Sequence, residues 1–216
     1  MEKIMTMAEA MDHIKDGMSI MFGGFLAVGA PEKFIDVLIE KGIKDLTIIT
    51  SDTGFPDKGT GRLVVNKQVK KVIASHIGTN PETGRQMHTG EIEVELVPQG
   101  TLAERIRSAG AGLGGVITPT GVGTVLEETK QKITLNGKDY LIEMPLKADV
   151  ALIKGAKVDK KGNVTYNNAA RNFNPVMAMA ADLVIVQADE IVEAGEINPN
   201  DVVTPGIFVD IIVKGV

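Results

Sequence analysis

The sequence contains no cysteine among its 216 residues. This absence excludes disulfide bonds, a thiol nucleophile and any metal site with cysteine ligands. The chain also lacks a surplus of basic residues, because 28 acidic and 23 basic side chains are interleaved and give a formal net charge of −5. Proteins that bind nucleic acid usually carry a basic face, so this balance argues against that class.

Apolar segments that could cross a bilayer are lacking as well. Residues 18–31 carry no charge but are too short to span the hydrocarbon layer. Residues 108–126 are long enough, but they contain six glycines, a proline and three threonines, which would leave backbone groups unsatisfied in lipid. The N-terminus does not have the order of a signal peptide. We therefore expect a cytoplasmic protein.

Several common motifs of enzyme sites are missing. No GxxxxGK[ST] phosphate loop and no GxSxG nucleophile elbow occurs. Residues 110–115 satisfy GxGxxG, but they follow a predicted helix instead of a strand, so we do not expect a dinucleotide site. The histidines His13, His76 and His88 form no HxxxH or HExxH pattern, so we expect no metal. His76 ends a predicted strand and is a candidate to line a pocket.

What is present is an alternation of helix and strand signals. Thr6 and Glu9 have the spacing of a capping box, and Gly42 has the position of a helix C-cap. Together with the apolar patterns, these signals predict the order of a parallel crossover unit. The predicted ranges are helix 7–15, strand 18–22, helix 31–41 and strand 46–50.

The rest of the chain continues this pattern and adds a hairpin. Residues 133–143 predict two antiparallel strands joined by the two-residue turn Asn136-Gly137. Thr101 and Glu104 have capping-box spacing and predict the start of a short helix. Further strands are predicted at 71–75, 91–97, 149–153, 162–166 and 182–188, and helices at 101–108 and 175–181. We find no internal repeat and expect one α/β domain over residues 1–216, with a mixed, largely parallel sheet flanked by helices plus an antiparallel hairpin.

Two glycine-rich loops, at residues 22–31 and 108–124, are the strongest local signals for function. Glycine costs roughly 0.5–1 kcal/mol relative to alanine in regular structure, so its accumulation calls for a reason. One reason is tight packing between a strand and a helix. The other is close approach by a ligand or by another chain, and the presence of two such loops favours it.

Residues 16–31, DGMSIMFGGFLAVGAP, resemble the signature of family I coenzyme A transferases. That signature consists of Asp-Gly, an apolar strand, Gly-Gly-Phe and then Gly-x-Pro. Further segments resemble the A (α) subunit of the family, in order along nearly the whole chain. They are residues 69–84, 94–115, 118–124, 151–156, 170–186 and 203–210. The likeness is greatest to α subunits that use acetoacetate with acetate or butyrate.

This resemblance implies half of an enzyme. In the family, a glutamate of the β subunit, in a Ser-Glu-Asn-Gly motif, attacks the acyl-CoA thioester in ping-pong catalysis. The present sequence has no such motif, so the nucleophile is expected on a separate β subunit, in an α2β2 assembly. Coenzyme A is then a co-substrate, and no tightly bound cofactor is expected. Two alternatives are a non-catalytic module that binds acyl-CoA and a sugar-phosphate isomerase.

The resemblance also implies which residues form the site. Ser51 stands where relatives commonly have asparagine, so it is a candidate for support of the oxyanion, although it could equally be a turn residue beside Asp52. The loop expected to approach coenzyme A consists of Gly24, Phe25, Leu26, Ala27, Val28, Gly29 and Ala30. The residues expected to line the substrate cleft are Gln99, Gly100, Gly112 and Gly114.

Overall fold

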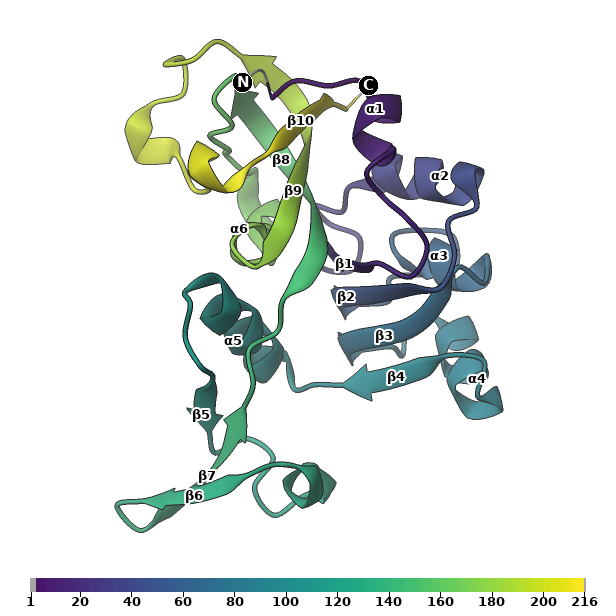
Figure 1. The fold of residues 1–216 in the computed structure, drawn as a ribbon, viewed down its shortest axis with the longest axis vertical. Coiled ribbons are helices and arrows are strands. Elements are labelled where there is room, and N and C mark those ends of the chain that lie inside the picture. Colours follow the sequence, from purple (N-terminus) through teal and green to yellow (C-terminus); the bar gives the residue numbers. More distant parts are fainter. Residues whose placement is uncertain (1–2, 216) are drawn as a thin grey trace.

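Seven parallel strands form the main sheet, in the order β10-β9-β8-β1-β2-β3-β4 (Figure 1). The computed structural model describes residues 3–215. The strands are β1 (Ser19–Phe22), β2 (Leu46–Asp52), β3 (Val69–His76), β4 (Glu93–Leu96), β8 (Ala148–Asp159), β9 (Ala181–Val192) and β10 (Ile211–Lys214). The predicted α/β architecture and the first parallel crossover are confirmed. The antiparallel strands form a sheet of their own, so the main sheet itself is not mixed.

Helices cover both faces of this sheet, and the core has two halves. The helices are α1 (Met7–Met11), α2 (Glu32–Lys41), α3 (Gly61–Val65), α4 (Pro81–Thr89), α5 (Gln99–Gly110) and α6 (Asn174–Ala178). Because side chains alternate along a strand, Ile20 and Phe22 of β1 pack with α1, α2 and α3, whereas Met21 packs with α5 and α6. Gly42 ends α2 in a left-handed conformation, as predicted.

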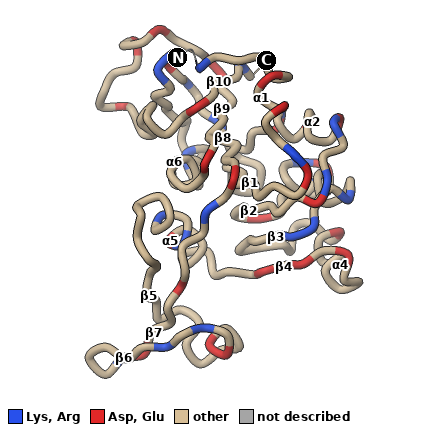
Figure 2. The backbone as a smooth tube through the Cα atoms, viewed as in Figure 1, with Lys and Arg blue, Asp and Glu red and all other residues tan. Residues whose placement is uncertain are grey.

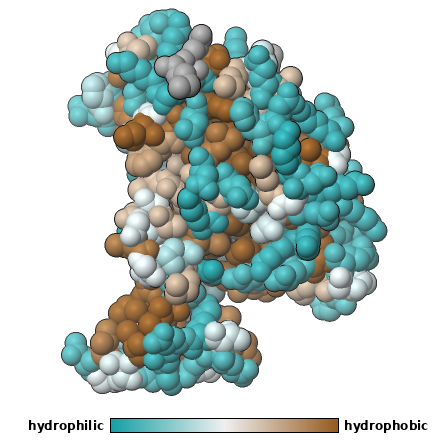
Figure 3. Space-filling view, in the orientation of Figure 1, coloured by the Kyte–Doolittle hydropathy of each residue, from teal (hydrophilic) through white to brown (hydrophobic). Residues whose placement is uncertain are grey.

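A small antiparallel sheet forms an arm that projects beyond α5 (Figure 1). It consists of β5 (Val116–Thr118), β6 (Lys132–Leu135) and β7 (Lys138–Glu143), with β7 in the middle. The predicted hairpin turn is confirmed, since Asn136 and Gly137 both have positive φ, of 52° and 76°. Basic and acidic residues are interspersed over body and arm (Figure 2). Apolar side chains gather on the arm (Figure 3).

Four of the predicted elements differ from the structure, and one of them is the helix predicted at 175–181, which ends at Ala178 because Ala181 begins β9. The first helix ends at Met11, and Asp12 is its C-cap. The predicted capping box at Thr101 is wrong, because α5 begins two residues earlier, where the N–H of Leu102 donates to the carbonyl oxygen of Pro98 at 2.8 Å. The predicted strand at 162–166 is wrong too, since only its residue Val164 forms isolated bridges. Strand β10 was not predicted.

The structure also contains a short internal repeat that the sequence analysis did not find. Residues 24–29 and 54–59 both read Gly-Phe-x-x-x-Gly, and each follows a strand and precedes a helix. In each, a bridge closes a two-residue turn, between Phe25 and Val28 in the first and between Phe55 and Lys58 in the second. We call residues 24–30 the first turn loop and residues 54–60 the second. The repeat is too short to be recognised from the sequence alone.

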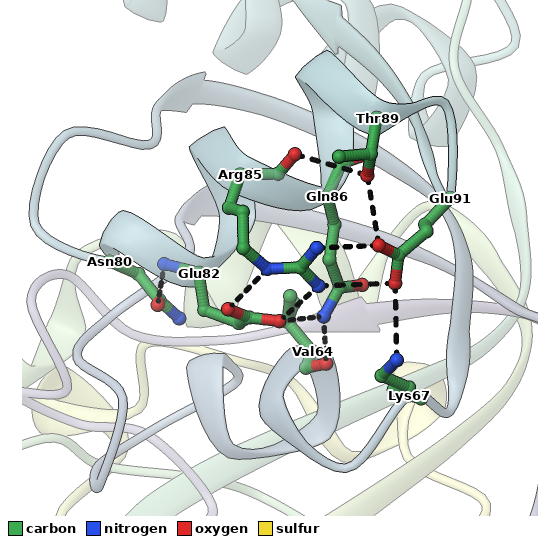
Figure 4. Close-up of polar contacts among 8 residues, drawn as sticks. All are labelled: Val64, Lys67, Asn80, Glu82, Arg85, Gln86, Thr89 and Glu91. Atoms are coloured by element: carbon green, nitrogen blue, oxygen red, sulfur yellow. Dashed lines mark hydrogen bonds and ion pairs between the residues drawn. The ribbon is translucent and has the colours of Figure 1, made fainter.

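Helix α4 is held by a cluster of charged side chains (Figure 4). The guanidinium of Arg85 contacts the carboxylate of Glu82 at 2.7 Å and that of Glu91 at 2.5 Å. The amide of Gln86 donates to the carbonyl oxygen of Val64 at 2.9 Å and so ties α4 to α3. Hydrogen bonds from Arg85 hold the pKa of Glu82 and that of Glu91 at about 2, below their ordinary value of 4.5.

Replacing Glu91 by glutamine is expected to make the free energy of unfolding less dependent on pH in the acidic range. The folded-state pKa of Glu91 lies below the unfolded value, so its contribution is full above pH 4.5 and is lost as the pH falls towards 2. Glu91→Gln should therefore show a smaller drop in the free energy of unfolding between about pH 7 and about pH 3, measured by urea titration. Glu128→Gln is the control, because Glu128 is exposed and its carboxylate makes no polar contact within residues 3–215. Equal drops in the two variants would contradict the prediction.

Candidate functional site

The candidate site lies where β1, β2, β3 and β4 end. In parallel sheets the loops after the carboxyl ends of the strands form the usual ligand site. Here the first turn loop follows β1, the second follows β2, Thr79 lies in the connection after β3, and Gln99 begins α5 shortly after β4. Four connections therefore reach the same edge of the sheet.

The end of β2 and the connections after β1, β3 and β4 line a cavity of about 390 Å³. It is lined by Phe25, Leu26, Ser51, Asp52, Ser75, His76, Thr79 and Gln99. The structure thus brings together residues that the sequence analysis selected separately, namely part of the first turn loop, Ser51 and Gln99. The prediction that His76 lines a pocket is confirmed. Ser75, Asp52 and Thr79 were not predicted as site residues. Ser75 and Thr79 lie in segment 69–84, which resembles the family, and Asp52 is next to Ser51.

The other residues selected for the substrate cleft lie elsewhere. Gly100 lines a second cavity, of about 510 Å³, between α5 and β5. Its lining residues are Gly100, Thr101, Glu104, Arg107, Val116, Ile117, Thr118 and Thr120. Gly112 and Gly114 line neither cavity. A Cβ atom at either glycine would meet no atom within 4 Å, so the fold of the described chain leaves space around both.

Gly23, which precedes the first turn loop, and the loop glycines Gly24 and Gly29 are explained by the packing and backbone conformation of the chain itself. A Cβ atom at Gly23 would lie 1.8 Å from Oδ1 of Asn174, and one at Gly29 would lie 2.6 Å from the carbonyl oxygen of Ala170. Gly24 has a φ of 124°, which a residue with a side chain rarely adopts. Packing therefore accounts for Gly23 and Gly29, and the backbone conformation accounts for Gly24. Approach of a ligand to the loop stays a prediction.

Two asparagines near α6 hold the same loop by hydrogen bonds. Asn172 accepts from the N–H of Gly24 at 3.1 Å and donates to the carbonyl oxygen of Val28 at 2.9 Å. Asn174 is fully buried and donates to the carbonyl oxygen of Gly29 at 3.1 Å. Both lie in the segment 170–186, which the sequence analysis noted only as a likeness. The signal available in the sequence was the pair of asparagines within this segment, because an asparagine that becomes buried usually has hydrogen-bond partners.

The polar side chains of the 390 Å³ cavity differ in their partners. Ser51 is 0% exposed, and its hydroxyl has no hydrogen-bond partner among the described residues. The hydroxyl of Ser75 donates to the carbonyl oxygen of Ser51 at 2.6 Å and lies 3.2 Å from Oε1 of Gln99. A buried hydroxyl without a partner is unfavourable in an empty site. The hydroxyl of Ser51 is thus left without a partner within the described chain, and its part in binding a ligand stays a prediction.

The cavity offers hydrogen-bond donors and apolar walls but no glutamate. Asp52 is the one carboxylate among its lining residues, and backbone N–H groups already occupy both of its oxygens. Residues 3–215 contain no group of three histidine, cysteine or acidic side chains placed to hold a metal ion. They also contain no helix with the length and apolar character needed to cross a membrane. The lining thus combines apolar walls with polar side chains, and it lacks a free carboxylate nucleophile.

Comparisons with known proteins agree on one family. Residues 4–215 match the family model described as coenzyme A transferase. The chain is 57% identical over 211 residues to acetate CoA-transferase subunit alpha of Escherichia coli K12, covering 98% of this chain and 96% of that one. It is 53% identical over 212 residues to the acetoacetyl-CoA:acetate/butyrate CoA transferase alpha subunit of Clostridium acetobutylicum, covering 98% and 97%.

Solved structures show the same fold. An acyl-CoA transferase of E. coli O157:H7, in a thioester complex with CoA, superposes with a TM-score of 0.88 at 23% identity. The match covers 99% of this chain but only 47% of the other, so the present chain spans about half of that protein. Glutaconate coenzyme A-transferase of Acidaminococcus fermentans gives a TM-score of 0.87 at 22% identity, covering 99% and 75%.

Proposed function

The chain belongs to the coenzyme A transferase family, and on that premise we propose that it is the α subunit of an enzyme that moves CoA between acetoacetate and a short-chain acid such as acetate or butyrate. The observation that carries this proposal is the similarity to two α subunits of that kind, each over 98% of this chain. The absence of a glutamate from the described lining of the cavity supports a nucleophile on another chain.

In the proposed reaction a glutamate of the β subunit is the nucleophile. One of its carboxylate oxygens attacks the thioester carbon, CoA leaves as the thiolate, and an acyl-glutamyl anhydride forms. The thiolate then attacks the glutamyl carbonyl carbon and releases the first acid as a carboxylate, which leaves a glutamyl-CoA thioester. The acceptor acid reverses both steps. The present chain contributes the apolar wall of Phe25 and Leu26 and the polar groups of Ser51 and Gln99.

We further propose an α2β2 assembly in the cytoplasm. Large exposed apolar patches mark surfaces that contact another chain. On the arm and its connections to the body, apolar side chains are exposed instead of buried (Figure 3). They are Leu113, Ile117, Val125, Leu135 and Met144. This exposed apolar surface supports the proposal that a β subunit binds to the chain. The catalytic glutamate would lie on that subunit.

The test is loss of acetoacetyl-CoA absorbance with acetate or butyrate, for the chain alone and for the chain co-expressed with its β subunit. We expect activity only from the pair, and none from a pair in which the β-subunit glutamate is replaced by glutamine. Activity of the lone chain would overturn the assignment of the nucleophile to the β subunit. An acyl-CoA-binding module would instead bind CoA esters alone and gain nothing from the β subunit.

A further inference from the structure

One carboxylate joins the two turn loops at the edge of the cavity. Asp52, the last residue of β2, is 5% exposed. Its Oδ2 accepts from the N–H of Leu26 at 2.9 Å, and its Oδ1 accepts from the N–H of Gly54 at 2.8 Å. The loops also lie close together, because a Cβ atom added at Gly59 would lie 3.4 Å from that of Ala27. Within residues 3–215, no cationic side chain pairs with this carboxylate, so backbone donors alone compensate its charge.

The first turn loop needs such support more than the second. Leu26 and Ala27 form its two central turn residues with φ of 47° and 65°, a left-handed conformation that side chains disfavour. The turn is closed by the N–H of Val28, which donates to the carbonyl oxygen of Phe25 at 2.9 Å. The corresponding residues of the second loop, Pro56 and Asp57, do not have positive φ. Strain at a turn of this kind persists only where surrounding contacts impose it.

The contacts that impose it come from two sides. From the side of α6, Asn172 holds Gly24, which directly precedes the turn, and Val28, which is its last residue. Asp52 holds the centre of the turn through Leu26, from the side of β2. The side chains thereby fixed, Phe25 and Leu26, are those that line the 390 Å³ cavity.

We propose that Asp52 is a positioning residue, whose carboxylate fixes the left-handed turn of the first loop so that Phe25 and Leu26 form the wall against which acyl-CoA binds. This inference rests on the proposed function for the identity of the ligand. A carboxylate is required because two N–H donors converge on the side chain from opposite loops. An asparagine offers one acceptor oxygen only, and its NH₂ group would face the second N–H donor.

Hydrogen exchange of the chain by itself tests the fixing of the turn. In Asp52→Asn, the amides of residues 24–30 should exchange about tenfold faster or more, because hydrogen bonds to a charged acceptor are among the strong ones. Asp57→Asn is the matched control, since Asp57 is an exposed acid of the second loop without a polar contact in the described chain. Its exchange at residues 24–30 should equal that of the wild type. Unchanged exchange in Asp52→Asn would overturn the proposal.

A second pair of variants covers the case in which Asp52→Asn does not fold. Ala27→Gly removes the Cβ atom that disfavours the left-handed turn, so it reduces the strain that Asp52 opposes. Asp52→Asn in this background should still exchange faster at residues 24–30 than Ala27→Gly alone. Equal exchange in these two variants would overturn the proposal as well.

Kinetics of the complex with the β subunit test the second half of the inference. Asp52→Asn should raise KM for acyl-CoA about tenfold or more with a smaller change in kcat, because the loop contacts the ligand in ground and transition states alike. Asp57→Asn should keep the KM of the wild type. An unchanged KM in Asp52→Asn would overturn the positioning role. If the wild-type complex transferred no CoA, the proposed function would fail, whereas hydrogen exchange would still decide whether Asp52 fixes the turn.

Discussion

Replacing Ser51 by alanine is expected to lower kcat of the complex with the β subunit by about 100- to 1,000-fold, which is the usual loss for one donor to an oxyanion. Ser51 lines the 390 Å³ cavity and is 0% exposed, and its hydroxyl has no partner among the described side chains or backbone groups. The same variant should not lower the free energy of unfolding of the chain. The hydroxyl that it removes makes no hydrogen bond in the folded protein, so no stabilising contact is broken. Steady-state kinetics and urea unfolding measure the two effects.

Thr53→Val is the matched control for Ser51→Ala. Thr53 is also 0% exposed and its hydroxyl is also unpaired within the described structure, but it does not line the cavity. The valine variant should leave kcat unchanged. If Ser51→Ala also left kcat unchanged, Ser51 would be a turn residue beside Asp52 and the oxyanion would be held by other groups. A fall in stability without a fall in kcat would point to the same conclusion.

The elements that the sequence predicted correctly are those set by local patterns. The first crossover follows from an apolar run, a glycine turn and a helix closed at Gly42, all within one short segment. The hairpin follows from Asn136-Gly137, whose conformational preferences fix the turn. By contrast, β10 is a run of four residues, and so short an apolar run does not distinguish a strand from other buried segments.

The candidate site was predictable in its position but not in its construction. Glycine signals and the order of strands indicated the loop after β1, because strand ends gather at one edge of a parallel sheet. The contacts that shape this loop come from Asn172 and Asn174, about 150 residues further along the chain, and no local pattern connects such distant positions. For the same reason the glycines suggested approach by a ligand, whereas the structure shows that residues 170–174 already occupy that space at Gly23 and Gly29.

Replacing Gly23 by alanine is expected to destabilise the chain by about 3 kcal/mol or more, through overpacking and loss of a buried hydrogen bond. The new Cβ atom would lie 1.8 Å from Oδ1 of Asn174, so that side chain must move. Asn174 is 0% exposed and accepts from the N–H of Lys154 at 2.9 Å. Its displacement leaves this N–H without its acceptor and releases the carbonyl oxygen of Gly29. For a chain of this size, about 3 kcal/mol corresponds to a fall in Tm of roughly 6–12 °C.

Gly84→Ala separates this steric effect from the general effect of adding a methyl group to a glycine. Gly84 lies inside α4, and a Cβ atom there would meet no atom within 4 Å. Alanine favours the helix over glycine by about 0.5–1 kcal/mol, so this variant should melt slightly above the wild type. The two variants thus make the same chemical change and should shift Tm in opposite directions. A Gly23→Ala protein as stable as the wild type would mean that Asn174 does not hold the loop as described, and Asn174→Ala would then leave hydrogen exchange at residues 24–30 unchanged.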